Sequence, residues 1–267
     1  ENENSSLEIR AAEILRSYLT KMYPKTGFKI SEVVNENETT IFALTLKNLE
    51  KSGQPAPGII PSIPESFSVY TIQANGKQQG YIVGADDRGL LYGIYSLLDK
   101  LGCGFYLSHE TVPVFSDFSF DNWSLNDEPL INERIVFNWH NFLSSCSSWN
   151  YEDWCSWIDQ SAKMRYNSIM VHAYGNNPMF SFEYNGLKKD VGYLTTSASG
   201  RDWGAQHVND VRRFPGGKVF KLPVFGSEAA KVPDEERSQA ATQLMGRVFQ
   251  HAKEIGMNVI FALDVDT

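Results

Sequence analysis

From about residue 127 onward, short apolar segments alternate with longer segments that have the periodicity of helices. The apolar segments are expected to be strands, and the longer ones repeat apolar residues at three- and four-residue spacing. The predicted strands are residues 134–138, 167–172 and 258–263, and the predicted helices are residues 149–165 and 235–255. Nearly continuous apolar strands that alternate with helices indicate a parallel sheet covered by helices.

The segment before this alternation has the pattern of a mixed sheet. Asn75-Gly76 lies between two β-rich segments, residues 67–72 and 80–84, and predicts an antiparallel hairpin. Two helices are also predicted, at residues 6–23 and 86–101. Two further strands are predicted at residues 28–33 and 41–46. We expect both helices to lie on one face of the sheet, which makes an α+β layer.

The first helix has a recognisable start. Ser5 and Glu8 have the spacing of a capping box, in which each residue satisfies a backbone N–H group at the beginning of the same helix. The change of pattern divides the chain into two predicted domains, residues 1–126 and residues 127–267.

Composition and charge exclude several kinds of partner. The chain has 267 residues, with 24 Lys and Arg against 32 Asp and Glu, and a net charge of −8. An acidic chain without a basic segment is a poor candidate for binding nucleic acid. No apolar segment approaches the roughly 20 residues that span a bilayer. Cys103, Cys146 and Cys155 form no metal-binding pattern, although one bridge between Cys146 and Cys155 stays open. We expect no metal and no cofactor.

Polar and aromatic residues follow the carboxyl end of each strand predicted in the second domain. In parallel α/β folds these ends meet at one edge, where ligands bind. We therefore predict from the whole set one concave site there, although each residue taken singly is more typical of an ordinary polar loop. The predicted site residues after the first two strands are Trp139, His140, Asn141, His172 and Asn176.

Two aspartates follow the third strand. Asp264 and Asp266 are two residues apart on an extended segment, so both point to one face and could form a carboxylate pair. The alternative is a polar exit from the strand. A metal site built from His140, His172 and Asp264 is a weaker alternative, because the chain has no compact ligand motif. The roughly 60 residues between residues 173 and 234 have little periodicity and are expected to wall one side of the site.

Three segments resemble carbohydrate-active enzymes. Residues 88–95, RGLLYGIY, resemble a helix start in the small α/β domain that precedes the barrel of microbial xylan α-glucuronidases and of β-N-acetylhexosaminidases. Residues 134–141, RIVFNWHN, resemble the first barrel strand of the α-glucuronidases, with His140 where that family has Asp. Residues 166–171, YNSIMV, resemble the second strand of both groups.

The resemblance implies an α/β exo-acting glycoside hydrolase. Residues 1–126 would be a small α+β accessory domain, and residues 127–267 the first part of a (β/α)8 TIM barrel that carries the catalytic site. Arg134 would bind sugar hydroxyls or a carboxylate, Trp139 would offer a stacking face, and the remaining predicted site residues would hydrogen-bond hydroxyls. A non-catalytic carbohydrate-binding or structural protein with the same architecture is the alternative.

The same resemblance carries expectations about activity and location. The general acid would lie at the end of a fourth strand, so we expect this chain alone to be inactive, with Asp264 and Asp266 as the only catalytic candidates. The open edge of the third strand favours self-association. The resemblance and the non-Met first residue together predict an extracytoplasmic location.

Overall fold

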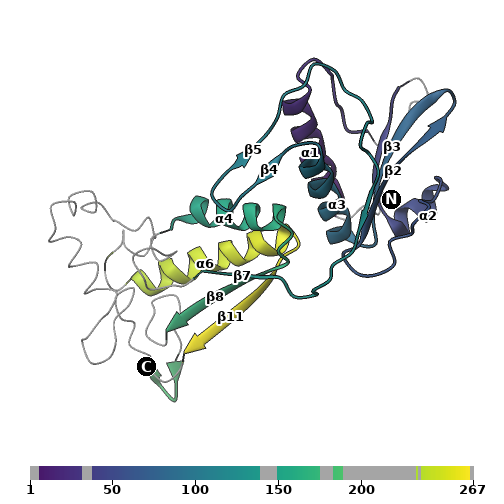
Figure 1. Ribbon diagram of the computed structural model, residues 1–267. Helices are drawn as coiled ribbons and strands as arrows, with labels where there is room; N and C mark the ends of the chain where they lie inside the picture. The colour runs from purple at the N-terminus through teal and green to yellow at the C-terminus, as the bar shows by residue number, and fades with distance from the viewer. Residues whose placement is uncertain are drawn as a thin grey trace. The chain divides into compact units, whose positions relative to one another are not determined.

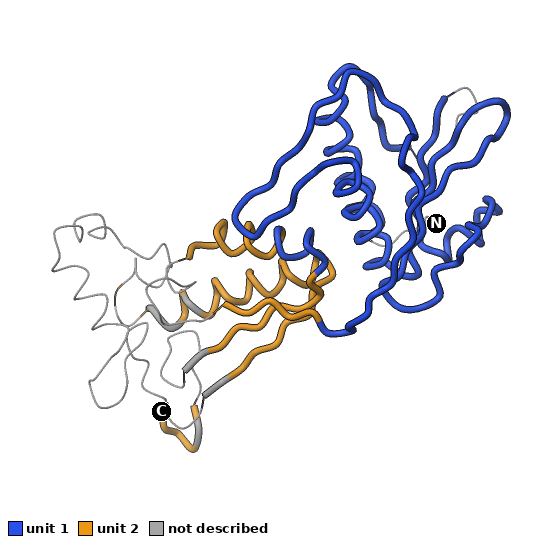
Figure 2. Tube along the Cα trace, viewed as in Figure 1, with its two compact units in different colours: residues 1–133, 160–165 blue, residues 134–159, 166–267 orange. Residues whose placement is uncertain are grey.

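The computed structural model describes residues 6–31, 38–138, 149–174, 183–188, 233 and 236–264. The chain forms two compact units, residues 1–133 with 160–165 and residues 134–159 with 166–267 (Figure 2). Within the described ranges, no helix has the length and apolar character needed to cross a membrane.

A four-stranded mixed sheet is the frame of the first unit (Figure 1). In spatial order its strands are β1 (Ile41–Thr45), β3 (Lys77–Gly84), β2 (Phe67–Ala74) and β6 (Leu125–Asp127). β1 runs parallel to β3, and β2 is antiparallel to both β3 and β6. The first unit's sheet therefore extends one residue beyond the predicted boundary at residue 126.

The predicted hairpin between β2 and β3 is confirmed. Asn75 and Gly76 both have positive φ, 52° and 75°, as the two central residues of a type I′ turn require. This turn matches the right-handed twist of the flanking strands and fixes their register, in which Ala74 pairs with Lys77 and Phe67 with Gly84.

Helices cover both faces of this sheet. α1 (Ser6–Met22) and α3 (Asp87–Lys100) lie on one face, and the short α2 (Leu46–Ser52) lies on the other (Figure 1). The larger core, between the sheet and α1 and α3, includes the fully or almost fully buried side chains of Ala11, Leu19, Ile82, Leu90, Ile94, Leu97 and Leu98. The placement of both long helices on one face is confirmed.

Asp86 explains why α3 begins where it does. Its carboxylate accepts a hydrogen bond from the backbone N–H of Gly89 at 2.7 Å, which satisfies one of the otherwise unpaired donors of the first turn. The other carboxylate oxygen accepts from the backbone N–H of Glu65 at 3.0 Å. Arg88 forms an ion pair with Glu65, 3.2 Å from Nη1 to Oε1, so the helix start is tied to the residues that lead into β2.

Two local predictions for this unit are wrong. Residues 28–31, the described part of a predicted strand, form no strand: Ile30 is 47% exposed, and Phe28 packs against the rings of Tyr23 and Phe118 instead of pairing with another strand. The predicted strand at residues 41–46 ends at Thr45, because α2 begins at Leu46.

Glu8 has a role that the capping-box pattern does not predict. The Glu8 carboxylate is buried and accepts hydrogen bonds from the backbone N–H of Thr45 at 2.8 Å and from Asn48 Nδ2 at 2.7 Å. It therefore caps α2, whose N-cap residue is Thr45, from a different helix. Ser5, the other half of the predicted box, lies outside the described residues.

Three parallel strands form the sheet of the second unit, as predicted (Figure 1). They are β7 (Ile135–Asn138), β8 (Ser168–Tyr174) and β11 (Asn258–Asp264), in that spatial order. α4 (Tyr151–Lys163) connects β7 to β8, and α6 (Arg237–Glu254) precedes β11. The strand order follows the chain order, as in a barrel, but the described strands form an open sheet, and the (β/α)8 barrel stays a prediction.

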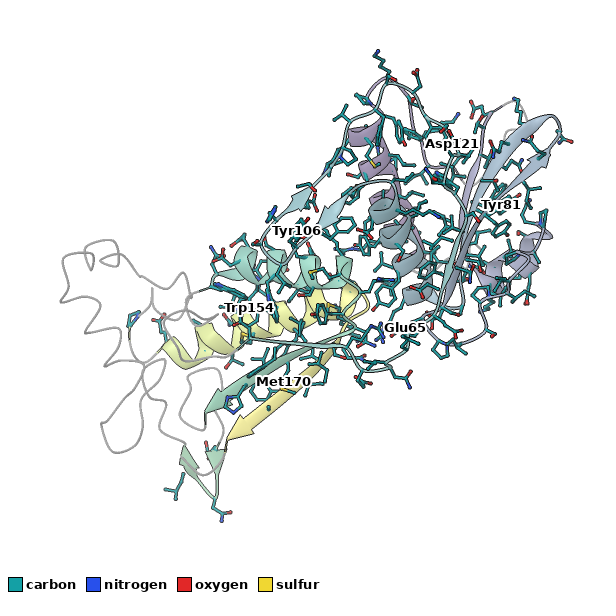
Figure 3. The ribbon with its side chains drawn as sticks, in the orientation of Figure 1. Glu65, Tyr81, Tyr106, Asp121, Trp154 and Met170 are labelled. Atoms are coloured by element: carbon teal, nitrogen blue, oxygen red, sulfur yellow. The ribbon has the colours of Figure 1, made fainter. Side chains whose placement is uncertain are left out.

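The helices of this unit cover one face of its sheet. Val136, Ile169 and Val171 are buried on that face, and the ring of Phe261, which pairs with Val171, lies 6.1 Å from Phe249 of α6. Side chains alternate along a strand, so the intervening residues point to the opposite face. That second face carries Ile135, Phe137, Met170 and His172. Met170 is labelled in Figure 3.

The remaining elements of the chain are short. Two small antiparallel hairpins are formed by β4 (Gly104–Phe105) with β5 (Glu110–Thr111), and by β9 (Glu183–Tyr184) with β10 (Leu187–Lys188).

Candidate functional site

The carboxyl ends of β7, β8 and β11 meet at one edge of the second unit's sheet. In the register of the sheet, Asn138 pairs with Val171, His172 with Ala262, and Tyr174 with Asp264. This edge is where parallel α/β folds place their ligands, because the loops that leave the strands converge there.

His172 is the predicted site residue whose side chain the structure describes at this edge. It is half-buried and lies on the face of the sheet opposite α4 and α6, since its neighbour Val171 is buried beneath the helices. An imidazole in this position can donate one hydrogen bond and accept another, as recognition of a sugar hydroxyl requires. Asp264 is the last described residue of β11, and its backbone lies two residues beyond the level of His172.

The other residues predicted for this edge cannot be placed. Trp139, His140, Asn141, Asn176 and Asp266 lie outside the described residues. The single concavity predicted for the strand ends therefore stays a prediction, and so does the pairing of Asp264 with Asp266. Almost all of the connection between residues 173 and 234 also lies outside the described ranges.

Arg134 lies at the opposite edge of the sheet from His172. Its backbone N–H donates to Asn167 Oδ1 at 2.9 Å, and its carbonyl accepts from the backbone N–H of Asn167 at 3.0 Å. Arg134 is therefore level with Asn167, which immediately precedes β8 and lies five residues before His172 along the chain. At about 3.3 Å per residue, the two levels are roughly 16 Å apart. The structure does not bring Arg134 together with the carboxyl edge.

Asn167 gives this amino edge a structural role. It is 2% exposed, and its carbonyl accepts a hydrogen bond from the backbone N–H of Asn258 at 2.8 Å. With its two bonds to Arg134, it joins the starts of all three strands. The residues at this edge therefore fix the register of the sheet, which positions the strand ends on the other side.

A polar contact between α4 and α6 was not anticipated from the sequence. The Arg247 guanidinium lies 4.0 Å from the ring centroid of Tyr151, and His251 Nε2 lies 2.8 Å from Asp159 Oδ1. Residues of α4 and α6 together line a hollow of about 520 Å³. Its lining residues are Tyr151, Gln243, Gly246, Arg247, Gln250, His251 and Glu254. The sequence signal for this contact is the spacing of Tyr151, Cys155 and Asp159, which lie one helical turn apart on one face of α4.

Cys155 in this contact is not an activated nucleophile. Burial raises the pKa of its thiol, and this effect outweighs the hydrogen bond with Tyr151, which lowers the pKa. A reactive cysteine requires the opposite shift, towards the thiolate. Cys155 is a free thiol in the structure, and Cys146 lies outside the described residues, so the bridge between them stays open. We interpret the α4–α6 contact as structural.

Metal binding finds no support in the described part of the chain. In these ranges, no group of three or more His, Cys, Asp or Glu side chains is arranged to hold a metal ion. The weaker alternative of a site from His140, His172 and Asp264 includes a residue outside those ranges.

Comparison with known proteins gives one informative result. No family model matches the chain, and no curated protein matches it significantly. Among solved structures, the chain is similar to a protein described as a GH138 enzyme targeting pectin rhamnogalacturonan II, with a TM-score of 0.50 and 15% sequence identity. The match covers 98% of this chain and 30% of that protein, so this chain spans less than a third of its length. At this identity the likeness shows the fold alone, a mixed α/β fold like that of a glycoside hydrolase.

Proposed function

We propose that this chain is part of a glycoside hydrolase that acts on a polysaccharide such as pectin or xylan. The observation that carries the proposal is the extent of the structural match: it runs through 98% of the chain and therefore includes residues of both units. The matched protein is described as targeting pectin rhamnogalacturonan II. The sequence resemblance to xylan α-glucuronidases supports the finer proposal of an exo-acting enzyme with a (β/α)8 barrel.

The carboxyl edge of β7, β8 and β11 is the proposed glycan-binding site. His172 supplies a hydrogen-bonding imidazole there, and Trp139, His140, Asn141 and Asn176 follow the same strand ends in the sequence. Arg134 is not part of this proposed site, because it immediately precedes β7 at the other edge of the sheet.

Glycoside hydrolysis needs two carboxyl roles around the scissile bond. One group protonates the leaving oxygen, and a second acts as base or nucleophile, at roughly 5 to 10 Å from the first. Asp264 and Asp266 are the carboxylates that this chain offers near the carboxyl edge. We propose them as contributors to substrate binding or catalysis, to be tested by Asp264→Asn and Asp266→Asn.

Replacement of His172 tests the binding site. With oligosaccharides from rhamnogalacturonan II or glucuronoxylan as probes, we expect His172→Ala to weaken binding by roughly 5- to 10-fold, the effect of losing one hydrogen bond to a neutral hydroxyl. His172→Gln keeps a donor and an acceptor and should restore part of the affinity. Isothermal titration calorimetry measures both variants.

A second histidine provides the matched control. His109 is exposed in the first unit, stacked on Tyr106, and His109→Ala should leave the affinity for both probes unchanged. If His172→Ala binds both oligosaccharides as tightly as the unmodified chain does, the proposed site at the carboxyl edge is wrong.

A further inference from the structure

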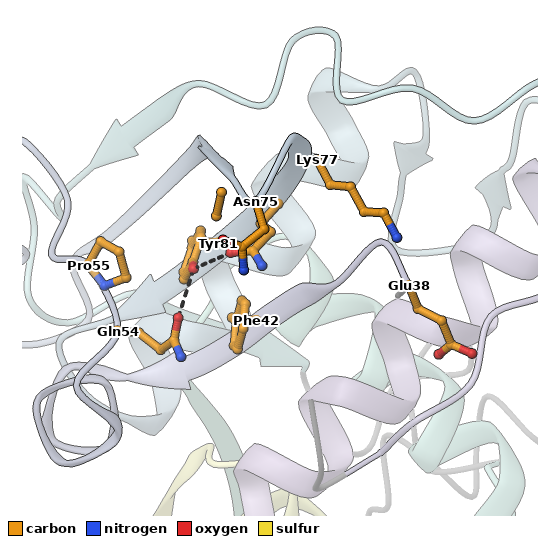
Figure 4. Close-up of a pocket in the computed structure, with 9 residues that line it drawn as sticks. Glu38, Phe42, Gln54, Pro55, Asn75, Lys77 and Tyr81 are labelled. Atoms are coloured by element: carbon orange, nitrogen blue, oxygen red, sulfur yellow. Dashed lines mark hydrogen bonds between the residues drawn. The ribbon is translucent and has the colours of Figure 1, made fainter. Parts of the chain in front are cut away.

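The first unit carries a hollow on the face of its sheet that bears α2. Its volume is about 210 Å³, below the roughly 300–1,000 Å³ of sites for drug-sized ligands, so it suits a single ring. Figure 4 shows the residues around it. They are Glu38, Phe42, Gln54, Pro55, Ala74, Asn75, Lys77, Gln79 and Tyr81.

A column of three aromatic rings supports the hollow. Phe42 of β1, Tyr81 of β3 and Tyr70 of β2 come from adjacent strands. The Phe42 and Tyr81 centroids are 4.7 Å apart at an interplanar angle of 12°, and those of Tyr81 and Tyr70 are 4.9 Å apart at 8°. Because each ring is held by its strand and by the next ring, the column is rigid. Phe42 and Pro55 add apolar surface beside the polar groups.

Side-chain amides surround the hydroxyl group of Tyr81. Its oxygen lies 2.9 Å from Gln54 Oε1 and 2.8 Å from Gln79 Oε1 (Figure 4). A hydroxyl has one proton, so it can donate to only one of these oxygens at a time. In the described part of the chain, no hydrogen bond is formed by the side-chain nitrogens of Gln54 and Gln79. The other amide satisfies the phenol oxygen by turning its nitrogen towards it and donating a hydrogen bond. One amide oxygen and one amide nitrogen are then available to a ligand.

The hollow is fixed in place and keeps its hydroxyl groups protonated. The Tyr70 hydroxyl donates to the carbonyl of Pro55 at 2.8 Å and holds the segment that carries Gln54 against the sheet. Burial raises the pKa of Tyr70 to about 12 and also raises the pKa of Tyr81. At neutral pH both phenols are uncharged hydrogen-bonding groups. A preformed site loses little conformational entropy when a ligand binds.

The chemistry of the lining selects a neutral ligand with several hydroxyls. Amides supply donors and acceptors in one plane, which suits vicinal hydroxyls, and the adjacent apolar surface suits the C–H groups of a sugar ring. Lys77 and Glu38 contribute one charge of each sign. We propose that this hollow binds one pyranose unit of a glycan and gives the first unit a carbohydrate contact of its own. This proposal does not depend on the carboxyl edge of the second unit.

Titration of the whole chain with simple glycosides tests the proposal. The probes are methyl β-D-xylopyranoside and methyl α-D-galactopyranoside, followed by the NMR shifts of backbone amides. We expect shifts at Gln54, Gln79 and Tyr81, with a dissociation constant on the order of 1–10 mM. Gln79→Ala should weaken binding roughly fivefold. Galacturonate, the charged comparison, should bind no more tightly than the neutral glycosides.

Gln78→Ala is the matched control. Gln78 is the preceding residue of the same strand, is exposed and donates to Thr71, so its removal should leave binding unchanged. His172→Ala should also leave these shifts unchanged, which separates this hollow from the carboxyl edge. The proposal is overturned if neither glycoside shifts residues of the hollow, or if Gln78→Ala and Gln79→Ala weaken binding equally.

Discussion

Gly84→Ala is expected to destabilise the first unit by about 3 kcal/mol or more, the upper range for overpacking a well-packed site. Gly84 is the last residue of β3 and lies directly under the first turn of α3. A Cβ atom at this position would overlap the backbone nitrogen of Leu90 and lie 2.5 Å from the carbonyl carbon of Gly89. Both are backbone atoms, so no side-chain rotation relieves the clash, and α3 would have to move away from the sheet.

Urea unfolding followed by circular dichroism measures this loss. Gly58→Ala is the control, because a Cβ atom at Gly58 has no atom within 4 Å and Gly58 does not have the positive φ that favours glycine. Its unfolding free energy should stay within about 0.5 kcal/mol of the unmodified chain. A Gly84→Ala chain with an unchanged unfolding midpoint would show that the packing of α3 on β3 is described incorrectly.

Glu8→Ala should destabilise the first unit by about 2–3 kcal/mol. The buried carboxylate accepts from the backbone N–H of Thr45 and from Asn48 Nδ2, and hydrogen bonds to a charged group are among the stronger ones. Truncation removes both acceptors and leaves the donors of Thr45 and Asn48 without them. The start of α2 should therefore lose protection in amide hydrogen exchange.

Two further variants serve as comparisons for Glu8→Ala. Glu8→Gln retains one acceptor for Thr45 and should recover about half of the loss, since the remaining bond is neutral. Glu13→Ala, on an exposed position of the same helix, should change stability by less than about 0.5 kcal/mol. Equal effects of Glu8→Ala and Glu13→Ala would contradict the capping of α2 by Glu8.

Local patterns were sufficient where a few neighbouring residues determine the structure. Asn75-Gly76 predicts its hairpin because both residues tolerate the positive φ that the turn needs. The start of α3 at Asp86 and the three parallel strands follow from similar short patterns. Glu8 shows what a local pattern does not reveal: Thr45 and Asn48, which donate hydrogen bonds to its carboxylate, are 37 and 40 residues away in the sequence.

The candidate site was predictable in its position but not in its full membership. The carboxyl edge follows from parallel strands, and His172 and Asp264 lie at it because each is near the end of its strand. Arg134 was assigned to the same site through a resemblance, but it precedes the first residue of β7 and so lies at the other edge. Because Arg134 lies at the start of the predicted strand, the sequence alone already places it away from the carboxyl edge.

The hollow in the first unit could not be found from sequence. Its lining comes from β1, from Gln54 and Pro55 after α2, and from the turn and strand at residues 74–81. No short segment contains enough of these residues to form a motif. They come together only when β1 pairs with β3 and the loop after α2 packs on the sheet.

The most direct test of the proposed function is glycan hydrolysis by the complete gene product. The substrates are rhamnogalacturonan II, glucuronoxylan, aryl glucuronides and aryl N-acetylglucosaminides, with released sugar measured by chromatography. We predict release of a terminal sugar from at least one of these substrates, and a loss of rate in His172→Ala. Binding of the oligosaccharides with no release from any substrate would contradict the hydrolase assignment and indicate a non-catalytic carbohydrate-binding protein.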